Sequence, residues 1–335
     1  MRGDRLSHAL VSGALVLPPL GDILVLNPRA GDGLSALPMS RLVLVQGFRP
    51  DHDVLAARGL AVFPAMPPRP YAAALVCLPR ARDHAQALIS QAAEAVTPGG
   101  PVIVDGQKSD GVEGTLRDLA ARVALSGPVV KAHGRLVTFP AGPGLEDWRA
   151  VPRSLPDGFV TRPGVFSADG PDRGSALLAA ALPAQMPGRG VDLGAGWGYL
   201  ARAALAREGV SLLDLVEAEA DALDCARQNI PDPRAAFHWA DATTFRPARP
   251  AHWVICNPPF HAGRAADPAL GAAFIAAAAR MLGPEGTLWL VANRHLPYGR
   301  TLSALFREVS EIGTDPGFRL TRAARPFPPT RKATL

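Results

Sequence analysis

A glycine-rich loop that follows a short apolar run constrains the fold of this 335-residue chain more than any other feature. The run ends in residues 191–193, Val-Asp-Leu, the loop occupies residues 194–198, Gly-Ala-Gly-Trp-Gly, and an Ala- and Leu-rich stretch continues from Tyr199 to about Arg207. Glycine adopts positive φ angles and lets a ligand come close to the backbone, so strand, loop and helix in this order are typical of nucleotide sites in α/β sheets. Glycines also serve ordinary turns, so the loop alone does not identify its ligand.

Two acidic residues are spaced to complete a nucleoside site. The next apolar run, Leu212 to Val216, ends at Glu217, which lies 19 residues after Gly198. An acid at the tip of the second strand of such a sheet binds ribose hydroxyls. Asp241 follows the expected third strand and is placed to meet an adenine amino group. Both also have ordinary interpretations, Glu217 as a solvated helix start and Asp241 as an N-cap or turn residue.

The tetrapeptide at residues 257–260, Asn-Pro-Pro-Phe, follows another apolar run at residues 253–256. An exocyclic amine is a poor nucleophile, and acceptors for both of its N–H groups would orient its nitrogen for attack on a sulfonium methyl group. The Asn257 side-chain oxygen and the Pro258 carbonyl could be these acceptors, and Phe260 could stack on the base. Loop and tetrapeptide together predict methyl transfer from S-adenosylmethionine to a planar NH2 group. A strand-ending turn is the alternative for the tetrapeptide, and a dinucleotide dehydrogenase is the alternative for the glycine loop.

The chain divides into two parts with similar alternation of strands and helices. A Pro- and Gly-rich stretch between about residues 141 and 160 is the expected linker, which gives domains at residues 1–145 and 146–335. In the first part we expect strands at residues 23–26, 41–46 and 73–78, and a helix at residues 84–96. The pattern predicts an α/β fold with two tandem Rossmann-like domains.

The first part repeats the second with its motifs changed. Residues 25–34 align with the segment around the glycine loop, residues 75–81 with 254–260, and residues 96–100 with 282–286. The alignment pairs Asn27 with Asp192, Arg29 with Gly194, Leu78 with Asn257 and Ala81 with Phe260. We interpret this as a duplicated fold whose first copy is degenerate and has lost both sites. Coincidence between two Rossmann-like halves is the alternative.

Composition bounds the class of protein. The formal net charge is +5, and 48% of the residues are hydrophobic, enough for substantial cores. The three cysteines form no C-x-x-C motif or Cys/His cluster, so no metal is expected. Because no apolar run reaches membrane-span length and the apolar stretch at residues 9–20 lacks a cleavage signal, we expect a cytoplasmic protein without membrane contact.

Five segments together resemble the tandem-domain ribosomal RNA guanine-N2 methyltransferases of the RsmC/RlmG type. They are residues 164–167 with 172–175, 192–198, 257–263, 291–298 and, in the first part, 106–112. The resemblance implies two class I S-adenosylmethionine-dependent methyltransferase domains. The second would methylate the N2 amine of a guanine in ribosomal RNA, with 16S RNA of the small subunit as the expected target. The degenerate first domain would support folding and RNA binding, in a monomer whose partner is ribosomal RNA or a ribosomal subunit.

The resemblance also implies roles for individual residues. The amine of the guanine would be held by Asn257, Pro258, Pro259 and Phe260, and a segment from Phe166 to Gly174 would close over the methionine part of the cofactor. The implied cofactor-binding residues are Phe166, Asp172, Gly174, Asp192, Gly194, Ala195, Gly196, Gly198, Glu217, Asp241, Ala242 and Asn257. Adenine-N6 and glutamine-N5 methyltransferases share the tetrapeptide, and a non-catalytic ribosome-assembly module is a further alternative. The degenerate first copy favours the ribosomal RNA family.

Overall fold

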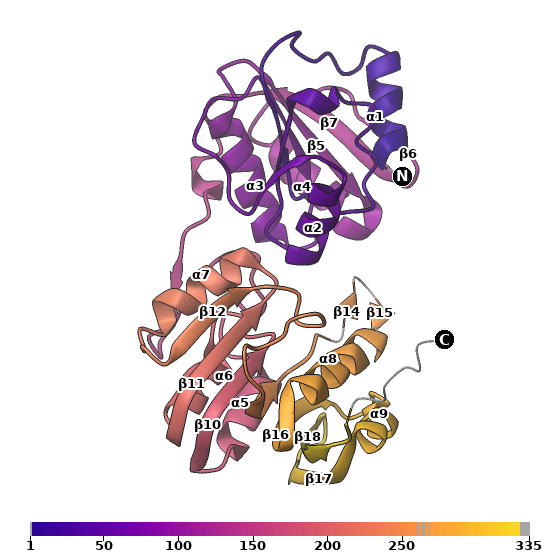
Figure 1. The fold of residues 1–335 in the computed structure, drawn as a ribbon. Helices are drawn as coiled ribbons and strands as arrows, with labels where there is room; N and C mark the ends of the chain where they lie inside the picture. The colour runs from indigo at the N-terminus through magenta and orange to yellow at the C-terminus, as the bar shows by residue number, and fades with distance from the viewer. Residues whose placement is uncertain (1, 260, 263–264, 267, 329–335) are drawn as a thin grey trace, which may run out of the picture. The chain divides into compact units, whose positions relative to one another are not determined.

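The computed structural model describes residues 2–259, 261–262, 265–266 and 268–328 (Figure 1). The chain forms two compact units. The first unit comprises residues 1–152 with 162–164, and the second comprises residues 153–161 with 165–335. Phe260, one of the predicted site residues, lies outside the described residues.

The described part of the first unit is built on a seven-stranded sheet of order β3-β2-β1-β4-β5-β7-β6. Strands β1 to β5 are parallel, whereas β7 runs antiparallel to both β5 and β6. The strands are β1 (Ile23–Leu26), β2 (Leu42–Val45), β3 (Ala61–Phe63), β4 (Ala73–Cys77), β5 (Pro101–Gln107), β6 (Val129–Lys131) and β7 (Gly134–Pro140). The helices are α1 (Arg2–Val11), α2 (Arg49–Ala57), α3 (Arg82–Ala95) and α4 (Val112–Ala120), with short 3-10 turns η1 (Met39–Arg41), η2 (Lys108–Asp110) and η3 (Glu146–Trp148).

The second unit has a seven-stranded sheet of order β12-β11-β10-β13-β16-β18-β17 in the part that the structure describes. Its strands are β10 (Gln185–Leu193), β11 (Glu208–Glu217), β12 (Ala235–Trp239), β13 (Ala251–Cys256), β16 (Leu282–Asn293), β17 (Phe306–Thr314) and β18 (Phe318–Pro326). The helices are α5 (Arg173–Ala181), α6 (Tyr199–Leu205), α7 (Ala220–Asn229), α8 (Pro268–Met281) and α9 (Tyr298–Leu305). Two short antiparallel pairs complete it: β8 (Arg153–Ser154) with β9 (Val160–Thr161), and β14 (His261–Ala262) with β15 (Ala265–Ala266).

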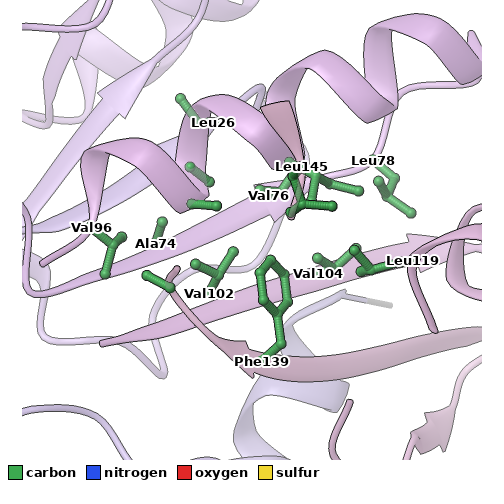
Figure 2. Close-up of a cluster of buried hydrophobic side chains, with 14 of the residues drawn as sticks. Leu26, Ala74, Val76, Leu78, Val96, Val102, Val104, Leu119, Phe139 and Leu145 are labelled. Carbon is green, nitrogen blue, oxygen red and sulfur yellow. The ribbon is translucent and has the colours of Figure 1, made fainter. Parts of the chain in front are cut away.

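Each sheet is covered by helices on both faces, and most residues at the centre of its strands are therefore apolar. All four residues of β1 and all five of β4 are buried. In the first unit one face packs against α3 and α4, and Figure 2 shows residues of this cluster, among them Val76, Val104 and Phe139. In the second unit α8 and α9 cover one face and α5 and α6 the other. Burial on both faces is the usual arrangement of parallel sheets.

The predicted architecture is confirmed. Both sheets are mainly parallel, and the two strand orders are identical when β1 to β7 are replaced by β10 to β13 and β16 to β18. The expected strands at residues 23–26, 41–46 and 73–78 correspond to β1, β2 and β4, and the expected helix at residues 84–96 corresponds to α3. Two sheets with one unusual strand order in common support the interpretation that the fold is duplicated.

Strand registers define which residues of the two sheets correspond. Gly100 and Gly286 both lie against a side chain four residues earlier, where an added Cβ would come 2.7 Å from Val96 and 2.8 Å from Leu282. This agrees with the alignment of residues 96–100 with 282–286. If Gly100 corresponds to Gly286, Val102 corresponds to Leu288. These two residues lie beside Ala74 in β4 and Val254 in β13, so Ala74 corresponds to Val254, and Cys77, three residues later, corresponds to Asn257.

The register of the first strand gives two further correspondences. Leu24 lies beside Ala74 in β4, and Val191 lies beside Val254 in β13, which places Val25 at Asp192 and Asn27 at Gly194. Backbone geometry agrees, because Asn27 and Gly194 have φ angles of 57° and 82°. Both also donate their backbone N–H to the last residue of the second strand over 2.9 Å, Val45 and Val216 respectively.

The pairs predicted from the sequence at Asn27, Arg29 and Leu78 were therefore wrong, whereas the alignment of residues 96–100 with 282–286 agrees with the structure. The structure shifts the pair at Asn27 by two residues and the pair at Leu78 by one residue. The physical reason is that a strand buried on both faces is apolar at every position. Such a strand lacks the alternation of apolar and polar residues that would reveal its register in the sequence.

Candidate active site

The site residues meet at the carboxyl edge of the second sheet. Leu193, the last residue of β10, lies beside Val216 of β11 on one side and Cys256 of β13 on the other. The glycine loop, Glu217 and Asn257 each come directly after these three positions. The chain leaves β10 toward β11 and returns through β13 on the opposite side, so this edge is the topological switch point at which open α/β sheets bind ligands.

The glycine loop has a backbone that other residues would strain. Gly194, Gly196 and Gly198 have φ angles of 82°, 56° and 93°. Gly198 starts α6, and a Cβ there would lie 2.6 Å from the side chain of Ile230. A Cβ on Gly196 would meet no described heavy atom within 4 Å. The loop is thus packed against the protein at Gly198 and open at Gly196, as a backbone that contacts a ligand requires.

Glu217 joins the end of β11 to this loop. One carboxylate oxygen accepts a hydrogen bond from the backbone N–H of Gly196 at 2.8 Å, and the other accepts from the N–H of Glu219, also at 2.8 Å. Burial raises the pKa of the Glu217 carboxyl above its ordinary value. The side chain is therefore directed toward the loop, where it can accept hydrogen bonds from a ligand bound there.

Asp192 is a buried acid whose charge has no partner among the described residues. The side chain is 0% exposed, and no described side chain donates to either carboxylate oxygen, although the backbone N–H of Ala201 acts to lower its pKa. Burial, and then the charge of Glu217, raises the pKa of Asp192 to about 8. A buried acceptor without a donor is destabilising. The position therefore suits a ligand that carries hydrogen-bond donors or a positive charge.

Asp241 and Ala242 lie just beyond β12. The Asp241 side chain accepts hydrogen bonds from the backbone N–H and hydroxyl of Thr243, at 2.8 and 2.7 Å, which is the geometry of a turn-forming Asp. Its backbone carbonyl accepts from Phe245. Ala242 is buried in the core. Asp241 thus orders the loop that follows β12.

The Asn257 side chain is held by two neighbours. Its amide nitrogen donates to a carboxylate oxygen of Asp172 and to the hydroxyl of Ser175, both at 2.9 Å. Pro258 is buried and Pro259 is exposed. The contacts use the amide nitrogen, so the amide oxygen of Asn257 is left as the atom that can accept from a substrate.

The segment before α5 contributes further residues of the site. Phe166 is 60% exposed, and its carbonyl accepts from the indole N–H of Trp197 in the glycine loop at 2.9 Å. Asp172 caps α5 through the backbone N–H of Ser175 at 2.9 Å, and the buried Gly174 lies against Phe318. The indole of Trp197 therefore joins this segment to the loop.

Sequence reasoning did not single out Ser175, Trp197 or Asn229 as site residues. Asn229 donates to the carbonyls of Val160 and Trp197, at 2.9 and 2.8 Å, and so ties α7 to the strand before the site and to the loop. The spacing of Asp172 and Ser175, an N-cap followed three residues later by its bonded partner, was a detectable signal. Asn229 had no comparable signal, because its partners are backbone groups distant in the sequence.

Neither a metal site nor a membrane-spanning helix is found among the described residues. Among the described residues, no group of three or more His, Cys, Asp or Glu side chains could hold a metal ion. Within the same part of the chain, none of the helices is long and apolar enough to cross a membrane. Cys256 is buried beside the site, and burial raises the pKa of its thiol well above the ordinary value. A thiol in that state is a poor nucleophile at neutral pH.

Comparison with known proteins agrees with this geometry. The model of the Methyltransferase small domain family matches residues 157–322. Ribosomal RNA small subunit methyltransferase C of Pseudomonas aeruginosa is 32% identical over 268 residues, covering 76% of this chain and 80% of the relative. Ribosomal RNA large subunit methyltransferase G of Shewanella amazonensis is 31% identical over 270 residues, covering 75% and 68%. The solved Thermus thermophilus (T. Thermophilus) 16S rRNA N2 G1207 methyltransferase, in complex with AdoMet and guanosine, has a TM-score of 0.79 at 24% identity, covering 97% of this chain and 91% of that one.

Fold and glycine loop define the protein as a class I S-adenosylmethionine-dependent methyltransferase. The chain belongs to the ribosomal RNA methyltransferase family that includes small subunit methyltransferase C and large subunit methyltransferase G. The described residues fit the cofactor, which carries an ammonium group, ribose hydroxyls and an adenine. The buried Asp192 without a partner suits a donor or cation, Glu217 offers carboxylate oxygens, and the space at Gly196 leaves room for a ligand against the backbone.

Proposed function

We propose that this protein transfers a methyl group from S-adenosylmethionine to the exocyclic N2 amine of a guanine in 16S ribosomal RNA of the small subunit. The observation that carries the proposal is the orientation of Asn257, whose amide nitrogen is bonded inside the protein at 2.9 Å to each of two acceptors. Its oxygen then faces the position of a substrate amine. The name of the Pseudomonas relative supports small subunit ribosomal RNA as the substrate, and the guanosine in the solved T. thermophilus complex supports guanine as the base.

Cofactor binding is assigned to the residues at the ends of β10, β11 and β12. Bound there, the cofactor supplies an electrophilic methyl group. Glu217 would accept hydrogen bonds from the ribose and Asp192 from donors of the methionine part, while Phe166 would cover the same region as an exposed aromatic side chain. Asp241 is assigned to the adenine. The other residues assigned to the cofactor are Gly174, Gly194, Ala195, Gly196, Gly198 and Ala242. Asp172 and Asn257, for which the resemblance also implies cofactor contacts, are assigned to the substrate side of the site.

The chain's contribution to the chemistry is to orient the amine. The Asn257 oxygen and the Pro258 carbonyl would accept its two N–H groups, which directs the nitrogen lone pair toward the methyl group. Phe260 is assigned to stack on the base; it lies outside the described residues. The methylated nitrogen is strongly acidic and can release its proton to water. No side chain with a strongly basic pKa is therefore required.

The first unit is assigned a supporting role in folding and RNA binding. Its sheet has the strand order of the catalytic unit, but Val25, Gln46 and Cys77 stand where that unit has Asp192, Glu217 and Asn257. A unit without these side chains has no evident site for the cofactor. We propose further that the protein acts as a monomer in the cytoplasm on ribosomal RNA or a ribosomal subunit.

A tritium-transfer experiment tests the proposal. The protein and methyl-labelled S-adenosylmethionine would be incubated in three separate reactions, one with small subunits, one with large subunits and one with naked ribosomal RNA. All three substrates would come from a strain that lacks the gene. Nucleoside analysis would then identify the labelled product. We expect N2-methylguanosine in 16S RNA.

Other outcomes would redirect the assignment in defined ways. Label in 23S RNA would move the target to the large subunit, and N6-methyladenosine or labelled glutamine would move the enzyme to the sister classes that share the tetrapeptide. Binding of the cofactor without transfer to any fraction would contradict the enzyme and favour an assembly module. Particles from the parent strain, already methylated, are the matched control and should accept little label.

A further inference from the structure

One oxygen atom of Asp172 links the helix cap to the substrate-binding Asn257. This oxygen, Oδ2, accepts from the backbone N–H of Ser175 at the start of α5 and from the amide nitrogen of Asn257, both at 2.9 Å. The Ser175 hydroxyl is the second acceptor for the same nitrogen at 2.9 Å. An amide nitrogen carries two hydrogens, so these two acceptors use both.

We propose that Asp172, together with Ser175, is a positioning residue for methyl transfer that fixes Asn257 with its oxygen toward the substrate amine. The inference rests on the proposed function and deepens it. Asp172 acts through Asn257 and not by binding the cofactor, the role that the family resemblance implied for it.

An unheld asparagine would present the wrong group half of the time. Rotation of the amide by 180° exchanges oxygen and nitrogen in nearly the same volume. The nitrogen of Asn257 would then point its hydrogens at those of the substrate amine, which also donates. Acceptors at fixed positions around the nitrogen exclude this orientation, and Asp172 supplies the charged one, which forms the stronger hydrogen bond.

The start of α5 is itself anchored, so its cap can serve as a fixed reference. Arg173 donates to a carboxylate oxygen of Asp315 at 2.7 Å. Gly174 packs so closely that a Cβ there would lie 2.8 Å from the ring of Phe318 and 3.0 Å from Oδ2 of Asp172. Glycine at this position lets the cap approach Asn257, and the contacts to Asp315 and Phe318 hold the helix end against β18.

The first unit has no amide at the position of Asn257. Cys77 stands at the position of Asn257, and the helix that precedes the first strand, α1, packs against β7 as α5 packs against β18. At the start of α1, Arg2 and Arg5 both donate to the buried Asp105. The first turn of this helix is therefore used to neutralise a buried acid within the unit.

Three substitutions at Asp172 separate orientation from helix capping and from cofactor binding. Asp172→Asn keeps an oxygen that can cap α5 and accept from Asn257. Asp172→Ser keeps a capping hydroxyl but is one bond too short to reach the amide of Asn257 as well. Asp172→Ala removes both. Asp224→Asn, an exposed change on α7 whose partner is Arg227, is the matched control.

We expect kcat for methylation of the RNA that accepts label in the tritium assay to fall roughly 10- to 100-fold in Asp172→Ser and Asp172→Ala. In both variants the amide oxygen of Asn257 is no longer held toward the substrate. Asp172→Asn and Asp224→Asn should stay within about 3-fold of the parent protein, and Ser175→Ala should fall between the two groups. The dissociation constant of S-adenosylmethionine, measured by calorimetry, should be unchanged in all of them. Only Asp172→Ala should lower the melting temperature, since it alone removes the cap.

Two results would overturn the inference. A raised dissociation constant in Asp172→Asn with normal kcat would show that the charge of Asp172 binds the cofactor. An unchanged kcat in Asp172→Ser, while the parent protein methylates RNA, would show that Asn257 needs no holder.

A readout without turnover keeps this test separate from the proposed function. The side-chain amide signals of Asn257 in a nitrogen-15 NMR spectrum can be assigned by their loss in Asn257→Ala. They should shift in Asp172→Ser and remain in place in Asp224→Asn. Unchanged signals in Asp172→Ser would disprove the contact, even if the parent protein transferred no methyl group to any RNA.

Discussion

The two sheets of this protein have the same strand order and opposite chemistry at their carboxyl edges. In the second unit the edge carries Asp192, Glu217 and Asn257, and in the first unit the corresponding residues are Val25, Gln46 and Cys77. The buried apolar strands are similar in both. The comparison teaches that this strand order forms without these three polar side chains, so the polar edge is a separate feature of the second unit.

Gln46 and Glu217 show how one position changed its role. Each accepts, through one oxygen, the backbone N–H two residues ahead, from Phe48 and Glu219 respectively, at 2.8 Å. The other end differs: Gln46 donates its NH2 to the carbonyl of Pro28 at 2.7 Å, whereas Glu217 accepts from the loop backbone. In the first unit this position therefore donates to the loop, whereas in the second unit it only accepts.

Charge burial also differs between the units. Asp105, in the first unit, is fully buried, and both of its carboxylate oxygens accept from Arg2 or Arg5 at 2.6 to 2.9 Å. Asp192, in the second unit, is equally buried, and no side chain among the described residues donates to it. The first unit thus neutralises its buried acid within the fold, and the second unit holds one without a cationic partner among the described residues.

The largest effect is expected where the two edges differ most in chemistry. Asn257→Ala should lower methyl transfer about 100- to 1000-fold, because one acceptor for the amine is removed, while cofactor affinity is retained. Cys77→Ala, at the corresponding place in the first unit, should leave transfer unchanged. The tritium assay, with calorimetric titration of S-adenosylmethionine, measures both. Normal turnover in Asn257→Ala would contradict the assigned role of the tetrapeptide.

Exchanging the residues at the second strand tip should weaken both units in different ways. Glu217→Gln introduces the first unit's residue and should reduce cofactor affinity about 10- to 100-fold, since a ribose acceptor is lost and an amide group faces the N–H of Gly196. Gln46→Glu should bring no cofactor binding and should destabilise the first unit by about 1–3 kcal/mol, because a carboxylate would face the Pro28 carbonyl. Calorimetry and urea unfolding test the two expectations. Full affinity in Glu217→Gln would remove Glu217 from the cofactor site.

Asp192→Val copies the first unit at the buried acid and should change the pH dependence of stability. The folded-state pKa of about 8 lies above the ordinary value of 3.8, so the folded protein binds a proton that the unfolded chain has released. The contribution of Asp192 to the free energy of unfolding is therefore fully present below about pH 4. It declines as the pH rises to 8, by roughly 1 kcal/mol per pH unit. Without cofactor, the free energy of unfolding of Asp192→Val should exceed that of the parent protein increasingly from pH 5 to pH 8. A difference that does not vary with pH would contradict this.

The smallest effects are expected from two glycines of the same loop. Gly198→Ala should lower stability by about 1–2 kcal/mol, because the φ angle is positive and the Cβ would press on Ile230. In Gly196→Ala the added Cβ has open space around it, so the free energy of unfolding should fall by about 1 kcal/mol or less. Its main effect should be a loss of affinity for the cofactor, which would meet the added methyl group. Thermal unfolding with and without S-adenosylmethionine separates these effects. Equal ligand-induced stabilisation of Gly196→Ala and the parent protein would show that the loop does not contact the cofactor.

The sequence by itself determined the fold class and the position of the site along the chain. Apolar runs, the glycine loop and the acid 19 residues after Gly198 are local patterns, and local sterics decide them. The edge at which Glu217 and the tetrapeptide meet the loop also follows, because parallel strands point their carboxyl ends the same way. The architecture predicted from the sequence was confirmed because it depends on these local patterns and on the common direction of parallel strands.

Tertiary structure alone decided which residues correspond and which support Asn257. The registers of β1 and β4 could not be read from strands that are apolar at every position. Asp172 and Ser175 reach Asn257 across more than 80 residues of chain, and Asn229 reaches Val160 across 69. Such contacts depend on how a helix end packs against a strand end. No local sequence pattern encodes the distance between a helix end and a strand end, because the packing of side chains between the two elements sets it.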